Sequence, residues 1–421
     1  MLTLWALGAS PDLIISHMKR NTSYVLLPPK FADEATVKSL LDPRSLEKTL
    51  GDETYYQDLV FFFEREIATL GIDEVLQKYI LGDSDLARTV YPRLYHGYVH
   101  AIMHVGLGLE FNQPTILAEG IAEAFVHDES WYTDYFAACQ KATDLMRPEG
   151  RLSLLEAYEA CTKDPVVRGC VDWELAEALT IPSDDWATAF AAMAAQGKEF
   201  KIPDEEPWRD RAWGRAGLNI AAITGKYWVR EDEDLERAAA EVISTSIYVA
   251  CAAMLPPHEF RVDFFLIHVS NASYWLQAYL QRPAISPDQK ARMIQDTGRL
   301  LTFIAAGVGT PELQPAVLES HVPKTNDGKG MDWEGVFAKA CRHADDGHMI
   351  KFIRALAHGE KACKPYEGQP GFPMRQDLFL KAANAALDNT TAKPMSFLRH
   401  FDILRGVGMP EAWRDVPTVE A

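Results

Sequence analysis

The chain has 421 residues and carries 60 acidic residues against 42 Lys and Arg residues, which gives a formal net charge of −18. This length exceeds the roughly 250–300 residues at which one hydrophobic core usually stops growing, so two packed lobes or a large helical body are expected. The negative charge argues against nucleic acid and anionic membranes as partners, because both need a positive field.

The chemistry of the cysteines and of the first residues indicates a cytoplasmic protein. The six cysteines form no Cys-x-x-Cys pair, which favours reduced thiols in a reducing compartment. The apolar start, residues 1–9, has no positive region before it and is too short to span a membrane. Leu2 and Leu4 begin an amphipathic segment without an N-cap residue, so we expect the sequence to start inside an element.

Apolar residues recur at three- and four-residue intervals along most of the chain, whereas alternating strand patterns are scarce. In chain order, this periodicity predicts helices over residues 59–70, 72–81, 113–125, 132–146, 185–195, 235–254 and 286–305. Ser286-Pro-Asp-Gln has the chemistry of a helix start, and Gly307 that of a helix end. The predicted fold class is all-α, a large multi-helix bundle that could divide into two packed lobes.

Two polar stretches, residues 198–208 and 323–330, are typical of exposed connections. The first is the predicted lobe boundary within a helical domain of residues 1–405, and residues 406–421 are expected to form a surface tail. Because the histidine-rich segments fall on both sides of the boundary, we expect their common site between the lobes. Glycine pairs such as Gly106 and Gly108 lack the third glycine of a dinucleotide fold, so a Rossmann-bound flavin or nicotinamide is not expected.

His96, His100 and His104 are spaced four residues apart, so a continuous helix would stack their imidazoles on one face. Neutral imidazoles suit iron, zinc, copper or nickel, and one helix can offer two of them. For any single one of these histidines, a structural role remains the alternative.

Partners for such a site occur far along the chain. His268 lies in an apolar segment, and His343, His348 and Lys351 lie in another. Burial favours the neutral ring, which can bind a metal. Three separate segments that each carry histidine favour a shared site over isolated core histidines.

Three ordered motifs resemble the questin oxidase-like family. They are His-x-x-x-His-Val-Gly-x-Gly-x-Glu-Phe at 100–111, Asp-Phe-Phe-Leu-x-His at 263–268, and His-Ala-Asp-Asp-Gly-His-x-x-Lys-x-x-Arg-Ala-Leu at 343–356. The resemblance extends from residue 1 to about residue 405. It implies an oxidoreductase of aromatic polyketide biosynthesis that acts on a flat, anthraquinone-like substrate by Baeyer–Villiger-type oxygen insertion or by ring cleavage.

The resemblance also implies a mononuclear non-haem iron held by several histidines and a carboxylated lysine, which corresponds to Lys351. A lysine desolvated among apolar neighbours has a lowered pKa, and the neutral amine can add carbon dioxide to become an anionic oxygen ligand. Family members ordinarily have a histidine-rich stretch before the segment that opens this sequence, so we expect a ligand to be missing or the start to be misassigned.

The predicted metal ligands are His104, His268, His348 and Lys351, and the predicted catalytic bases are His100 and His343. Gly106 and Gly108 favour His104, because glycines let a backbone or a planar substrate come close. Asp346 is expected to cap the helix that carries Lys351, with a role in orienting His343 or His348 as the alternative.

The leading hypothesis is an iron-dependent oxygenase that uses O2, with NADPH as a possible co-substrate. A helical scaffold protein that has lost the chemistry is the second hypothesis, and a zinc hydrolase is the third. The sequence does not define the oligomeric state.

Overall fold

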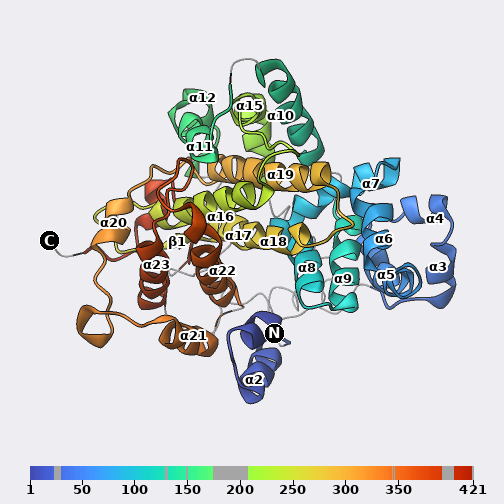
Figure 1. Cartoon of the computed structure of the whole chain (residues 1–421), viewed down its shortest axis with the longest axis horizontal. Coiled ribbons are helices and arrows are strands. Elements are labelled where there is room, and N and C mark those ends of the chain that lie inside the picture. Colours follow the sequence, from blue (N-terminus) through green and yellow to red (C-terminus); the bar gives the residue numbers. More distant parts are fainter. Residues whose placement is uncertain are drawn as a thin grey trace, which may run out of the picture.

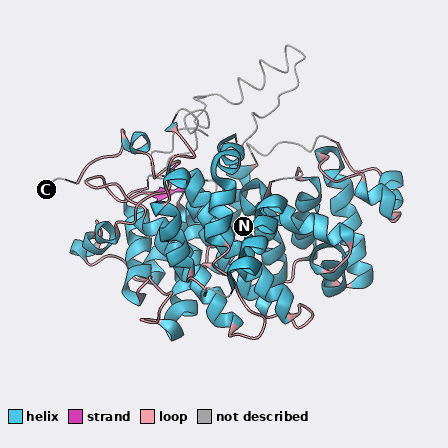
Figure 2. Ribbon diagram, turned by 90° about the horizontal axis from the view of Figure 1, so that it is seen from above, coloured by secondary structure: helices cyan, strands magenta, loops and turns pink. Residues whose placement is uncertain are grey.

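A computed structural model describes residues 1–22, 30–128, 131–147, 150–173, 207–343, 345, 347–390 and 403–419. These residues are mostly helical and contain one short parallel sheet, in which β1 (Val262–Asp263) pairs with β2 (Ile403–Leu404). Figure 2 shows how small this strand pair is beside the helices. The all-α prediction is confirmed. None of the described helices is both long and apolar enough to cross a bilayer.

The described helices fall into two groups, before and after the undescribed residues 174–206. The first group is α1 (Leu2–Ala6), α2 (Pro11–Asn21), α3 (Glu34–Ser39), α4 (Pro43–Glu47), α5 (Tyr56–Leu70), α6 (Ile72–Leu76), α7 (Asp85–Val90), α8 (His96–Glu110), α9 (Pro114–Val126), α10 (Tyr132–Met146), α11 (Leu154–Lys163) and α12 (Pro165–Arg168). The second group is α15 (Pro207–Thr224), α16 (Leu235–Ala252), α17 (Phe264–Tyr274), α18 (Leu276–Leu280), α19 (Pro287–Gly307), α20 (Pro315–Ser320), α21 (Trp333–Arg342), α22 (His348–Cys363) and α23 (Gln376–Asp388).

The periodicity located five of the long described helices. The segments predicted over 59–70, 113–125, 132–146, 235–254 and 286–305 correspond to α5, α9, α10, α16 and α19. Ser286 and Gln289 form a capping box at the start of α19, as the sequence indicates. The segment 72–81 is instead divided into α6 and a π-helical turn, Gln77–Leu81. The helix predicted over 185–195 lies outside the described residues.

Helices α16, α17 and α19 contact one another at the centre of the molecule, and other helices surround them (Figure 1). Helices α8 and α22 both pack against α17, although they are far apart in the sequence. The central position of α17 therefore brings the three histidine-rich segments together.

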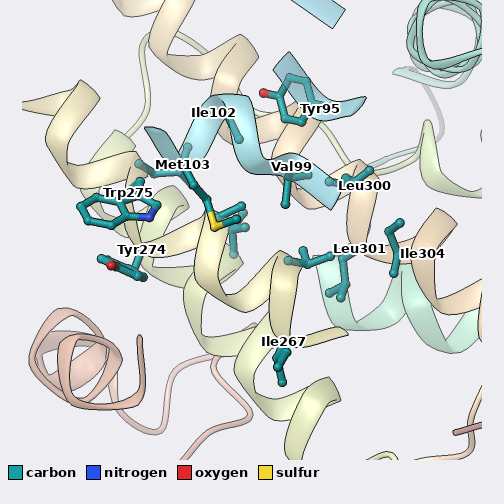
Figure 3. Packing of buried hydrophobic residues seen from close by; sticks show 14 of the residues in the cluster. Tyr95, Val99, Ile102, Met103, Ile267, Tyr274, Trp275, Leu300, Leu301 and Ile304 are labelled. Carbon is teal, nitrogen blue, oxygen red and sulfur yellow. The ribbon is translucent and has the colours of Figure 1, made fainter. Parts of the chain in front are cut away.

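Buried apolar side chains from Val37 to Val416 form one large cluster. Figure 3 shows part of it, where Ile102 and Met103 of α8 lie near Trp275 at the end of α17. A side chain at position 106 would meet this ring, because an added Cβ would lie 2.7 Å from the Cβ of Trp275. Gly106 therefore permits close helix packing, and Gly108 lets the backbone of Leu117 approach in the same way, whereas approach of a planar substrate stays a prediction.

The predicted lobe boundary and the predicted surface tail have different outcomes. Residues 198–206 lie outside the described residues and residues 207–208 open α15, so a lobe boundary there stays a prediction. The described part of the predicted surface tail is packed against the core instead. Val407, Trp413 and Val416 are buried, and the indole N–H of Trp413 donates to the Val407 carbonyl at 2.8 Å.

Candidate metal centre

His100, His268 and His348 come together from α8, α17 and α22, and their nearest ring nitrogens all lie within 4.8 Å of one another. The Nε2 atoms of His268 and His348 are 3.2 Å apart. Both of these residues are buried, whereas His100 is partly accessible. Three converging imidazoles form a donor set that could hold a metal ion.

The backbone at the start of α8 differs from the continuous helix that the histidine spacing predicts. Gly97, Tyr98 and Val99 have φ values of 56°, 57° and 60°, which is a left-handed turn. This turn separates His96 from the other two histidines, and the ring of His96 lies 5.0 Å from that of His127. The prediction of three stacked imidazoles is therefore wrong for the first one.

The left-handed turn places the ring of Tyr98 beside the histidine group. Its centroid lies 5.8 Å from that of His268, 5.7 Å from that of Phe264 and 5.4 Å from that of Phe265. Tyrosine and valine rarely adopt positive φ, and each such residue stores strain of about 1–3 kcal/mol. Strain of this kind is typical of functional sites, and nothing in the sequence around Tyr98 signals it.

The start of α17 fixes the orientation of His268. The buried carboxylate of Asp263 accepts hydrogen bonds from the backbone N–H groups of Phe265 and Leu266, which caps the helix. The Nδ1–H of His268 donates to the Phe264 carbonyl at 2.5 Å. Because a carbonyl can only accept, this bond leaves the Nε2 lone pair directed at His348.

The start of α22 is held by Asp345. The carboxylate of Asp345 accepts from the backbone N–H of Gly347 at 2.9 Å and of Met349 at 2.7 Å. Asp346 lies outside the described residues. The cap allows His348 to be the first residue of the helix, with Lys351 three residues later on the same face.

Lys351 acts electrostatically on the histidine group. Burial lowers the pKa of His100 and of His268 well below the ordinary value, and the positive charge of Lys351 lowers both further. Both rings are therefore neutral at physiological pH, which is the form that binds a metal.

His104 was predicted as a ligand but is not among the three clustered histidines. Its Nδ1 lies 2.8 Å from Oε2 of Glu123 on α9, and its ring stacks near that of His100 with centroids 6.4 Å apart. Burial acts to lower the pKa of His104, but the Glu123 carboxylate outweighs it and raises the pKa. The side chain of His104 is 36% exposed.

His343, the second predicted base, ends α21 and is not part of the cluster either. Most of the remaining histidines have structural partners. His17 bonds to the Cys341 carbonyl, His127 to the Arg93 carbonyl, His258 to the Val416 carbonyl and His321 to Asp388.

Four residues near the site were missed from the sequence: Tyr98, Glu123, Asp345 and Arg405. The guanidinium of Arg405 lies 4.3 Å from the centroid of the Phe264 ring. A usable signal existed only for Asp345, because acidic residues close to a helix start are favourable for the helix dipole. Tyr98, Glu123 and Arg405 come close to the site only through tertiary packing.

Comparisons with known proteins agree with this picture. The family model described as questin oxidase-like matches residues 1–356. Baeyer-Villiger monooxygenase dmxR6 of Cryptosporiopsis sp. is 32% identical over 400 residues, which cover 94% of this chain and 82% of that protein. The questin oxidase of Aspergillus fumigatus is 30% identical over 430 residues, which cover 100% of this chain and 87% of that protein. Oxidoreductase AflY of Aspergillus parasiticus is 29% identical over 389 residues, which cover 92% of this chain and 72% of that protein. The chain therefore belongs to the questin oxidase-like family.

Proposed function

We propose that this protein is a non-haem iron oxygenase that acts on a flat aromatic polyketide, with an anthraquinone-like ring system as substrate. The observation that carries the proposal is the convergence of His100, His268 and His348 with their donor atoms inside 4.8 Å. The three residues lie on three helices that are far apart in the sequence, so only the folded chain brings them together.

The spacing of His268 and His348 fits a single metal ion. Two nitrogen ligands about 2.1 Å from one ion lie about 3.0–3.4 Å apart at ordinary coordination angles. The 3.2 Å between the Nε2 atoms of His268 and His348 falls in this range. The Nδ1 hydrogen bond of His268 is the outer contact that metal-binding histidines usually make. We assign His100 as the third imidazole ligand, whereas the sequence suggested that it is a catalytic base.

Lys351 in its carboxylated form is the proposed fourth ligand. Its neutral amine nitrogen bonds to the carbon of CO2 and loses one proton to solvent, so the product carries one negative charge. Three neutral imidazoles supply no charge, and an anionic oxygen donor complements them on an iron cation. The positive charge of Lys351 contributes to the lowered pKa of His100 and of His268. This effect supports a position of Lys351 close to the two rings, which a shared metal ion requires.

The remaining side chains would bind and orient the substrate. When bound, the metal would supply activation of O2. The rings of Tyr98, Phe264 and Phe265 form an aromatic wall beside the histidines, which suits a planar ligand. The His104–Glu123 pair keeps Nδ1 of His104 engaged, so its Nε2 can accept a hydrogen bond from a substrate phenol.

The name of dmxR6 supports Baeyer–Villiger insertion, and the family resemblance of the sequence motifs implies ring cleavage as the alternative. Baeyer–Villiger insertion places one oxygen atom of O2 in the product and releases the other as water, which requires two electrons from a reductant such as NADPH. Ring cleavage by dioxygenation keeps both oxygen atoms in the product and requires no reductant.

The test is turnover of an anthraquinone under 18O2 by iron-loaded and zinc-loaded protein, with and without NADPH. Incorporation of one or two labelled atoms only with iron supports the proposal and separates the two reactions. Label from H2 18O alone, with zinc as the active metal, would instead establish a hydrolase. Stable protein without any metal or turnover would support the scaffold hypothesis.

A further inference from the structure

Asn271 of α17 has a buried side-chain amide without a hydrogen-bond partner. The residue is 0% exposed, and neither Nδ2 nor Oδ1 has a partner among the described residues. Leaving both halves of an amide unsatisfied in a protein interior is unfavourable, so buried polar groups of this kind require an explanation. A group that the side chain binds when the site is complete is one such explanation.

The helical spacing places Asn271 on the side of α17 that carries His268. Asn271 follows His268 by three residues, which puts the two on one face. The opposite side of the helix packs on α16, where Ser270 donates to the Ser246 carbonyl and Ser273 bonds to the Ser246 hydroxyl. The unpartnered amide is therefore directed away from α16 and toward the helices that hold the histidine group.

The register between α17 and α22 identifies what faces Asn271. His268 meets His348 through their Nε2 atoms at 3.2 Å, and the Tyr274 hydroxyl lies 3.4 Å from a guanidinium nitrogen of Arg354. Each contact joins residues 80 apart, so the two helices run parallel in this region. By this register, the position halfway between the two contacts places Asn271 level with Lys351 along the two helices.

We propose that Asn271 is a positioning residue that donates a hydrogen bond from Nδ2 to an oxygen of carboxylated Lys351. The inference rests on the proposed function, because it concerns the modified lysine. An unmodified ammonium offers only donors and cannot accept from Nδ2. Carboxylation adds two acceptor oxygens and extends the side chain by about 2 Å, from one C–N and one C–O bond.

The proposed hydrogen bond would satisfy Nδ2 of Asn271 and orient the carbamate of Lys351. Nδ2 gains an acceptor, and one carbamate oxygen is held so that the other is free to face the histidine nitrogens. Outer contacts of this kind typically change metal affinity by about 10–100-fold. Asn271 would not touch the substrate, so its effect should appear first in carboxylation and iron binding.

The experiment compares the full-length protein with N271L, which has a similar volume without polar atoms, and with N271D, which keeps the shape but loses the donor. S270A on the opposite face of the same helix is the matched control. Carboxylation is read from the 13C NMR signal of Lys351 under limiting 13C-bicarbonate, and iron affinity from titration of the metal-free protein with Fe(II).

We expect about a 10–100-fold weaker iron affinity and a smaller carbamate signal in both Asn271 variants, with partial recovery in excess bicarbonate and no change in S270A. Carbamate occupancy and iron affinity equal to the wild type in N271D, or in N271L if N271D does not fold, would overturn the inference and leave the proposed function intact. A wild-type protein that binds iron without any carbamate signal would overturn the inference and the ligand role of Lys351, and one that binds no iron would overturn the proposed function as well.

Discussion

The Nε2 atoms of His268 and His348 face each other across 3.2 Å, while Nδ1 of His268 is committed to the Phe264 carbonyl. His268 therefore presents a lone pair at Nε2, and His348 can either donate a hydrogen bond to it or bind the same cation. A metal ion between the two rings satisfies both lone pairs at once. The folded protein should accordingly bind a metal more tightly than the unfolded chain does.

Metal removal should destabilise the protein. Because only the native state assembles the three histidines, Fe(II) at 100 times its dissociation constant should add about 2.7 kcal/mol to the free energy of unfolding. Thermal unfolding with Fe(II) and with a chelator measures the difference. The H268A variant should show the same midpoint in both conditions, and a wild type that ignores iron would contradict the prediction.

Gly97→Ala should weaken both stability and iron binding. Alanine at φ 56° is strained, and its Cβ would lie 2.7 Å from Nε2 of His127, so we expect a loss of about 2–4 kcal/mol. Gly71→Ala is the matched control, because Gly71 has φ 85° but no atom within 4 Å of the added Cβ. It should lose about 1–2 kcal/mol and keep its iron affinity. Equal losses in urea unfolding would show that the contact with His127 is unimportant.

Glu123→Gln should separate substrate orientation from metal binding. The carboxylate holds Nδ1 of His104, so its loss should reduce kcat/KM about 10-fold while iron content stays near that of the wild type. H104Q should behave in the same way. Loss of iron from H104Q would instead restore the ligand role that the sequence suggested for His104.

His358 should make the protein less stable in acid. Burial, followed by the charges of Arg354 and Lys361, lowers the pKa of His358 to about 4, and its Nε2 is buried without a partner among the described residues. The unfolded chain therefore binds this proton more readily, and stability is lost as the pH falls from about 6.5 to about 4, by about 3 kcal/mol. The difference in unfolding free energy between wild type and H358L should vary across this window and be constant between about pH 7 and 8. A difference that does not vary with pH would contradict the assignment.

The sequence indicated five of the described helices and the three segments of the site, because both depend on local spacing. Apolar periodicity located α10 and α19, and apolar surroundings indicated the burial of His268. Four-residue spacing misplaced His96, since nothing in Tyr98 or Val99 predicts a left-handed turn. The choice between His100 and His104 depended on Glu123, which comes close only when α9 packs on α8.

Fe(II) titration of the purified chain and of its H100A, H268A and H348A variants, with H258A as the control, measures whether the three histidines hold the iron. His258 bonds to the Val416 carbonyl and is not part of the histidine group. The account predicts one tightly bound iron per chain in the wild type and in H258A, and at least a 100-fold loss of affinity in each of the other three variants, since loss of a direct ligand should exceed the 10–100-fold effect of an outer contact. Wild-type affinity in those three variants, or a wild type that binds no iron, would contradict it.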